Sequence, residues 1–253
     1  MASDPFSDQP PEEGAHHTPG HRRRRQQRPR LTPPAAVVQP LVRHSFSVPI
    51  GSIHLTGELG LPSQATGLVL ISHCLGDSRF SWRSRYFSHL LQQADLGTFS
   101  LDLLTPEEER RQHLAPPPLA LLAERLVQSA KWTQSQAGLL GLRLGLLGED
   151  AASTAALVAC SQLGTLVGGI VCLGSQLSDD IPATTAPTLL LVGDQDVAGL
   201  HASQQTQRRL GGTSQVHTLT QTDHFFREPT TVAQAADEAA TWFNKYLAKP
   251  RPM

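Results

Sequence analysis

The chain has 253 residues, of which 39% are hydrophobic, and a formal charge of −1; this fits one α/β domain of about 200 to 250 residues with a tail. Cys74, Cys160 and Cys172 are an odd, sparse set without C-x-x-C spacing, which argues against a disulfide framework. No apolar run approaches the roughly 18 residues of a membrane span, and the N-terminus lacks the apolar stretch of a signal peptide. We therefore expect a cytoplasmic protein with no membrane partner.

Residues 1–40 differ in composition from the rest of the chain. They are rich in Pro, Gln, His and Arg, and they carry six arginines and four acidic residues, hence a net charge of +2. So little apolar surface cannot offset the entropy lost on ordering, and we expect a disordered arm before a domain at 41–253. The arginine run 22–25 is interpreted as a solubilising tail or as an arm that contacts an acidic partner. No base-reading motif accompanies it, so nucleic-acid binding is not expected.

Hydrophobic periodicity predicts the secondary structure of the domain. The segments 45–50 and 53–59 alternate apolar and polar residues around a turn, which indicates an antiparallel hairpin at a sheet edge. Further strands are predicted at 67–73, 98–103, 142–148, 166–173, 187–193 and 215–219. Helices are predicted around 86–91, at 119–133, through 155–160, at 199–209 and at 230–247, while the charged segment 105–113 is interpreted as a loop or helix start.

Alternating strands and helices of this length predict a mainly parallel, twisted sheet with helices on both faces. Ligands bind such sheets beyond the carboxyl ends of the strands. This rule selects five places as candidates for a site, which are 73–78, 102–109, Asp150, 194–197 and His224.

The segment Gly148-Glu149-Asp150-Ala151-Ala152 has the form of a nucleophile elbow, G-x-S-x-G, between a strand and an alanine-rich helix. The sharp turn leaves room only for small flanking residues, which Gly148 and Ala152 supply. The central serine is replaced by Asp150, so a carboxylate stands at the position of the nucleophile. In a second interpretation the elbow is shifted by three residues, and Ser153 is the nucleophile.

Two further residues complete the order nucleophile, acid, histidine. Asp196 lies in the turn after the strand at 187–193, and His224 follows the strand at 215–219. This is the chain order of α/β-hydrolase triads. Asp194 shares the turn with Asp196, and we assign it the structural role of capping that turn. His224 could also be an ordinary surface-loop histidine.

Candidate oxyanion donors come from two loops. One is the backbone N–H of Ala151, directly after the elbow residue, and the other is the N–H of Cys74 or Leu75, after the strand at 67–73. Cys74 is a further, less favoured candidate nucleophile, because packing is the expected role of all three cysteines.

Together these motifs resemble the α/β-hydrolase superfamily, and within it the compact dienelactone hydrolase-like branch. The resemblance covers residues 42–248 and rests on the segments 70–73, 101–109, 148–152, 193–196 and 223–229. It implies a single domain without a large cap, and hydrolysis of esters or lactones by a Ser or Cys nucleophile. The sequence departs from that pattern at Asp150 and at Cys74, where the oxyanion loop would carry glycine.

A carboxylate nucleophile suits attack on saturated carbon, because an ester carbonyl would give a reactive anhydride. Haloalkane dehalogenases and epoxide hydrolases, which resemble this chain in fold, carry Asp at this position, usually followed by Trp and accompanied by a helical cap. Here Ala151 follows Asp150. The sequence therefore supports two hypotheses: a hydrolase of a small ester, lactone, epoxide or carbon–halogen substrate, or an inactive binding or scaffold module. We expect no cofactor and no metal, because the sequence has neither a metal-ligand cluster nor a Gly-rich phosphate loop.

Overall fold

The computed structural model describes residues 43–74, 78–111, 116–174, 181–223, 226 and 228–248, without the side chains of Arg43 and Ala137. These residues belong to one compact unit at 33–253. The predicted arm at 1–40 lies outside the described residues.

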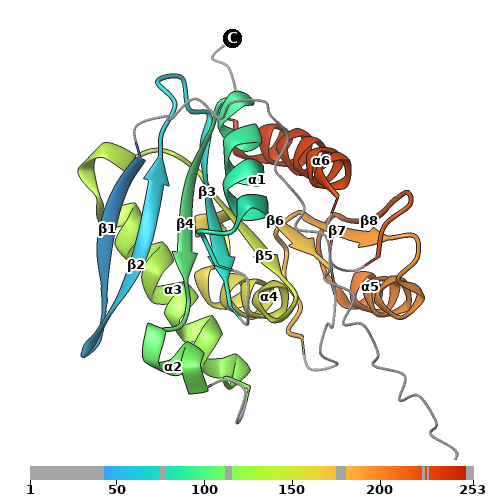
Figure 1. Ribbon diagram of the computed structural model, residues 1–253, viewed down its shortest axis with the longest axis horizontal. Coiled ribbons are helices and arrows are strands. Elements are labelled where there is room, and N and C mark those ends of the chain that lie inside the picture. The colour runs from blue at the N-terminus through green and yellow to red at the C-terminus, as the bar shows by residue number, and fades with distance from the viewer. Residues whose placement is uncertain are drawn as a thin grey trace, which may run out of the picture. The chain divides into compact units, whose positions relative to one another are not determined.

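Within the described residues, eight strands form one sheet (Figure 1). Their order is β1-β2-β4-β3-β5-β6-β7-β8. The strands are β1 (Arg43–Ile50), β2 (Ile53–Gly60), β3 (Gly67–His73), β4 (Leu96–Asp102), β5 (Leu144–Glu149), β6 (Val167–Leu173), β7 (Thr188–Gly193) and β8 (Ser214–Leu219). The hairpin of β1 and β2 is antiparallel and lies at the edge, while β3 to β8 run parallel, as the sequence predicts.

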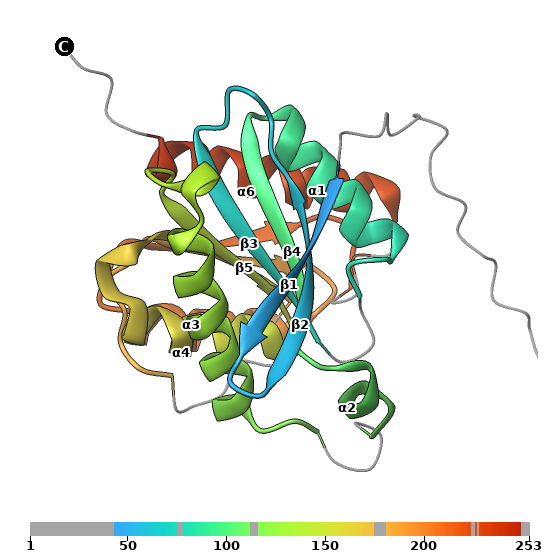
Figure 2. The same ribbon diagram turned by 90° about the vertical axis from the view of Figure 1, so that its left-hand side faces the viewer.

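Two helical layers enclose the sheet. The helices are α1 (Trp82–Gln93), α2 (Pro106–Arg111), α3 (Leu119–Ser135), α4 (Ala151–Leu163), α5 (Val197–Arg209) and α6 (Pro229–Leu247), with short 3-10 turns η1 (Ala137–Leu139) and η2 (Gly164–Leu166). Figure 2 shows α1 and α6 on one face and α3 and α4 on the other. Each layer has its own buried apolar cluster against the sheet. The strands β3, β6 and β7 are buried along their whole length, which explains their continuous apolar runs.

The predicted helix ends differ from the observed ends by a few residues. The charged segment at 105–113 forms a short helix, α2, because Thr105 and Glu108 build a reciprocal capping box. The Thr105 N–H donates to Glu108 Oε2 at 2.9 Å, and the Glu108 N–H donates to Thr105 Oγ1 at 3.3 Å. The expected helix at 199–209 begins two residues earlier, at Val197, because Asp196 caps it.

The strand order reverses around β3, whose neighbours are β4 and β5. At such a reversal the following helices depart on opposite faces and leave a crevice at the carboxyl ends of the strands. The end of β5 is thus a favourable place for a site. Within the part of the chain that the structure describes, none of the helices combines the length and apolar character needed to cross a bilayer.

Candidate functional site

Asp150 alone makes the turn from β5 to α4. The strand ends at Glu149 and the helix begins at Ala151, and Asp150 between them has φ 48° and ψ −118°. This is a sparsely populated backbone conformation for a residue with a Cβ, and it costs about 1–3 kcal/mol. Surrounding hydrogen bonds hold it, since the Asp150 N–H donates to the carbonyl of Leu173 at 3.1 Å and the Asp150 carbonyl accepts from Ser153 N–H at 3.0 Å. The exposed side chain of Asp150 therefore stands at the position of an elbow nucleophile.

The first turn of α4 leaves no room for a side chain at Gly148, the small residue that flanks the elbow. A Cβ on Gly148 would lie 2.4 Å from the carbonyl carbon and oxygen of Ala152 and 2.6 Å from the nitrogen of Ser153. The first turn of α4 thus passes directly over Gly148. Ser153 is fully buried in that turn and donates its hydroxyl to the Gly148 carbonyl at 2.7 Å. The shifted elbow with Ser153 as nucleophile is therefore wrong: Ser153 is a structural residue of the turn.

The turn after β7 places Asp196 at the carboxyl edge of the sheet, two strands from Asp150. Asp196 is the N-cap of α5, and its Oδ1 accepts the N–H of Gly199 at 2.9 Å. A cap of this kind fixes the direction of the carboxylate. Adjacent strands lie about 4.8 Å apart, so the ends of β5 and β7 are separated by about 10 Å.

Asp194 has a different structural role from the one expected. Its carboxylate reaches the segment after β8 and accepts the N–H groups of Gln221 and Thr222 at 3.0 and 3.2 Å. The Gln195 N–H also donates to the carbonyl of Thr222 at 3.1 Å. The turn that carries Asp196 is therefore fastened to the segment that leads into residue 224. The predicted histidine His224 itself lies outside the described residues.

Of the candidate oxyanion donors, Ala151 is the first residue of α4, so its N–H has no acceptor within the helix. Cys74 follows β3 and is partly buried against the core of the α3 and α4 layer. Leu75 lies outside the described residues. Burial raises the pKa of the Cys160 thiol, and it raises that of Cys172 to about 12. These two buried cysteines pack in the core.

An ion pair that the sequence analysis missed adjoins the elbow. The Arg83 guanidinium, from α1, donates to Glu149 Oε2 at 2.8 Å, and each side chain is only 21% exposed. The pair lines a small pocket with Phe87, Leu173, Phe226, Val232 and Ala235. Glu149 immediately precedes Asp150, so Arg83 supplies positive charge beside two consecutive acidic residues. In the sequence, the three closely spaced arginines at 79, 83 and 85 were the only indication of such ion pairs. The neighbouring residues do not indicate which acidic residues pair with them.

A second missed pair fixes the chain beyond β3. The Arg79 N–H donates to Asp102 Oδ1 at 3.1 Å, and its guanidinium pairs with Asp102 Oδ2. The guanidinium also lies 4.1 Å from the centre of the Phe80 ring. Burial lowers the pKa of Arg79. Asp102 ends β4, so this pair anchors the segment before α1 to the same edge of the sheet as Asp150.

Among the described residues, no three His, Cys, Asp or Glu side chains gather as a metal site would require.

Comparison with known proteins locates this arrangement in a family, although no family model matches the chain. The chain is 34% identical over 221 residues to a Mycobacterium tuberculosis protein provisionally named a phosphoribosyl transferase; the match covers 86% of this chain but only 50% of that protein. The chain therefore spans about half the length of the curated relatives it matches.

Solved structures give fuller matches. A dienelactone hydrolase from Anabaena variabilis is 34% identical, with a TM-score of 0.77, over 81% of this chain and 98% of that one. A dienelactone hydrolase-like promiscuous phosphotriesterase from metagenomic libraries shares the fold, with a TM-score of 0.67 at 14% identity, over 82% of this chain and 99% of that one. The eight-stranded, mainly parallel sheet between helices is thus the α/β-hydrolase fold. Since the match to the Anabaena protein spans nearly all of that hydrolase, the chain belongs to the dienelactone hydrolase family.

Proposed function

We propose that this chain is a hydrolase of a small ester, lactone or related electrophile, and that Asp150 acts from the nucleophile position. The supporting observation is the backbone of Asp150, held at φ 48° between β5 and α4. A strained conformation persists only where the surroundings impose it, and such conformations cluster at functional sites. The turn thus has the geometry of a nucleophile elbow with an aspartate at its central position.

The other roles in the proposal follow from position. His224 would be the base, because it follows β8 and because the segment before it is bonded to the turn of Asp196. Asp196 would orient the imidazole from the end of β7. Asp150 follows β5 and Asp196 follows β7, and the ends of these two strands lie about 10 Å apart. This separation leaves space for an imidazole between the two carboxylates. Backbone N–H groups of Ala151 and of Cys74 or Leu75 would stabilise a developing oxyanion.

The favoured reaction is displacement at saturated carbon. An Asp150 carboxylate oxygen forms a bond to that carbon, while the bond to halide or to the epoxide oxygen breaks and the leaving group takes the electron pair. Water, deprotonated by His224, then attacks the carboxyl carbon of the resulting Asp150 ester. The bond from the carboxyl carbon to the alkoxide oxygen breaks, and the imidazolium gives its proton to that oxygen, so that the alcohol leaves. The Asp150 carboxyl group then loses its proton to solvent, or to the alkoxide that epoxide opening formed, and the carboxylate is restored. For an activated ester, Asp150 would instead serve as the base that activates water.

We do not propose phosphoribosyl transfer, the activity in the name of the mycobacterial relatives, as a second function of this chain. It belongs to proteins about twice as long as the matched region, since the match covers 50% of them. A phosphoribosyl transferase must bind several phosphates, which proteins hold with Gly-rich loops and helix N-termini. The elbow instead presents the carboxylate of Asp150 at the N-terminus of α4, and a negative side chain there opposes phosphate binding.

A substrate panel of aryl esters, lactones, epoxides and haloalkanes, assayed on the full chain, tests the proposal. Asp150→Asn and His224→Ala should each lower activity at least about 100-fold, since each removes a catalytic group. Glu107→Gln, a change on the exposed surface of α2, is the matched control and should leave activity unchanged.

A single turnover in ¹⁸O-labelled water separates the two roles of Asp150. A nucleophile takes the label into its own carboxylate, whereas a water-activating base leaves it in the product. Activity that survives in Asp150→Asn would remove Asp150 from the mechanism. Activity that appears only in Asp150→Ser would instead support a scaffold protein that has lost its nucleophile.

A further inference from the structure

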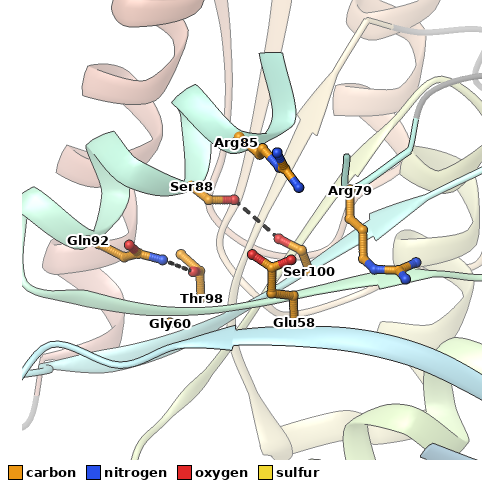
Figure 3. Close-up of a pocket in the computed structure, with 8 residues that line it drawn as sticks. All are labelled: Glu58, Gly60, Arg79, Arg85, Ser88, Gln92, Thr98 and Ser100. Atoms are coloured by element: carbon orange, nitrogen blue, oxygen red, sulfur yellow. Dashed lines mark hydrogen bonds between the residues drawn. The ribbon is translucent and has the colours of Figure 1, made fainter. Parts of the chain in front are cut away.

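A polar pocket lies where α1 packs on the sheet (Figure 3). Its lining comes from β2 (Glu58 and Gly60), from α1 and the segment before it (Arg79, Arg85, Ser88 and Gln92), and from β4 (Thr98 and Ser100). The interface between a helix and a sheet is ordinarily apolar. Here Ser88, Gln92, Thr98 and Ser100 are all at most 6% exposed. Buried polar groups of this kind require hydrogen-bond partners.

The hydrogen bonds seen in the pocket leave one requirement unmet. Gln92 Nε2 lies 2.6 Å from Thr98 Oγ1, and Ser88 Oγ lies 3.2 Å from Ser100 Oγ, as Figure 3 shows. Gln92 Oε1 is buried and has no partner among the described residues. A buried carbonyl oxygen without a partner is destabilising, because it has lost its hydrogen bond to water and gained none in the protein.

Within the described part of the chain, one polar atom of the Gln92 amide lacks a partner in either orientation of the amide. The separation of 2.6 Å also suits an O–H···O bond, in which the Thr98 hydroxyl donates to the amide oxygen of Gln92. With the amide turned in that way, its NH₂ group is the one left without an acceptor. In either orientation one polar atom of the Gln92 amide needs another partner. In the Ser88–Ser100 pair, likewise, one hydroxyl proton is used and the other is not.

The size and charge of the pocket restrict what can meet this need. Its accessible volume is about 10 Å³, which corresponds to one water molecule. Two guanidinium groups, those of Arg79 and Arg85, and one carboxylate, that of Glu58, line the pocket, so a further cation is disfavoured. A Cβ at Gly60 would lie 2.1 Å from Gln92 Nε2, so no side chain from position 60 can replace the missing partner. The volume limits the occupant to about a single heavy atom, and water of that size can donate to the Gln92 amide oxygen and accept from a hydroxyl of the Ser88–Ser100 pair.

We propose that this pocket is the binding site of one ordered water molecule. The water hydrogen-bonds to the Gln92 amide and to a hydroxyl of the Ser88–Ser100 pair. The water thereby links α1 to β4, whose side chains do not satisfy all of each other's hydrogen-bonding groups. Because α1 also carries Arg83, which pairs with Glu149, the water helps to fix the helix that supports the elbow.

A high-resolution crystal structure of the full chain tests the proposal directly. We expect one water peak within 3.2 Å of an amide atom of Gln92 and of at least one hydroxyl of Ser88, Ser100 or Thr98. An empty pocket would overturn the proposal, and so would density that refines as a metal ion or as a larger molecule. This measurement uses the unaltered protein, so it does not depend on any variant folding.

A pair of variants provides the solution test. Gln92→Met keeps the length of the side chain and removes both polar atoms, while Gln93→Met makes the same change at the exposed neighbouring position on α1. Nuclear Overhauser effects between long-lived water and the side-chain protons of Ser88, Thr98 and Ser100 should be present in the wild type and in Gln93→Met. They should be lost in Gln92→Met, although these three side chains are unchanged in that variant. Their absence from the wild type, or their full persistence in Gln92→Met, would contradict the assignment.

Discussion

A Cβ at Gly148 would lie 2.4 Å from the main-chain carbonyl of Ala152, which is closer than Cβ atoms approach other atoms in folded proteins. The contact exists because one residue, Asp150, turns the chain from β5 into α4. Helix α4 therefore begins directly over the end of the strand. The small residue of the elbow is thus a steric requirement of this particular turn.

Gly148→Ala should destabilise the protein by at least about 1–3 kcal/mol, because backbone atoms cannot move aside as a flexible side chain can. Urea denaturation measures the loss. Gly138→Ala is the matched control, since a Cβ at Gly138 meets no atom within 4 Å. Equal stability of the two variants would show that α4 does not pass so close to the strand.

The sequence predicted the sheet well because buried parallel strands require continuous apolar runs. The strands β3, β6 and β7 have no exposed residue to interrupt the pattern. Short helices were harder to predict. Helix α2 has no buried residue and therefore no apolar stripe, so the Thr105–Glu108 capping box was its most specific sequence signal.

At the site, the elbow was predictable because its geometry restricts residue types locally. The ion pairs Arg83–Glu149 and Arg79–Asp102 were not, since their partners are 66 and 23 residues apart and meet only when α1 packs on the sheet. Asp194 shows the same limit: the sequence indicated a local cap, but its carboxylate bonds to the neighbouring loop at Gln221 and Thr222.

The Arg83–Glu149 pair should be coupled more strongly than an ordinary surface pair. Each of its side chains is 21% exposed, whereas those of Arg111 and Glu107 on α2 are 70% and 62% exposed. Double-mutant cycles with Arg→Met and Glu→Gln should give about 1 kcal/mol for the first pair and about 0.5 kcal/mol or less for the second. Equal coupling energies would mean that the partial burial of the Arg83–Glu149 pair does not strengthen its interaction.

Asp194 and Asp196 should differ in which backbone amides they protect. Asp194→Ala removes the acceptor of Gln221 and Thr222, so hydrogen exchange should accelerate there. Asp196→Ala removes the cap of α5, so exchange should accelerate at Gly199, with a loss of about 1 kcal/mol in stability. Each variant is the control for the other, and identical exchange patterns would show that the two carboxylates share one role.

The three thiols should react at different rates in the native protein. Cys160 and Cys172 are 1% exposed, and burial raises the pKa of both, to about 12 for Cys172. The thiolate is the reactive form, so both should resist iodoacetamide at pH 8. Cys74, which is partly exposed, should be alkylated first, as peptide mass spectrometry would show. Fast labelling of Cys172 in the folded state would contradict its burial.

The bonds of Glu108 should make stability depend on pH in the acid range. Its carboxylate accepts two hydrogen bonds from the Arg125 guanidinium at 2.7 Å each, and it also caps α2. These bonds, with the Arg125 bond the largest cause, lower the pKa of Glu108 from 4.5 to about 2. A lowered pKa in the folded state contributes stability that is fully present above pH 4.5 and is lost as pH falls toward 2. The pKa difference gives an upper bound of about 3 kcal/mol, which solvent screening reduces because the Glu108 side chain is 35% exposed.

Glu108→Gln should therefore unfold at lower urea concentration than the wild type at pH 6, and the difference should shrink progressively between pH 5 and pH 2. Glu107→Gln, one residue away, is the matched control. Its carboxylate is 62% exposed and, among the described residues, is paired with Arg111 on the surface of α2, so its difference from the wild type should stay small at every pH. The buried Arg125 explains the contrast, because protonation of Glu108 leaves a guanidinium that is 6% exposed without its anionic partner. A pH-independent difference for Glu108→Gln would show that the capping bonds to Thr105, and not the charge of Glu108, hold α2 in place.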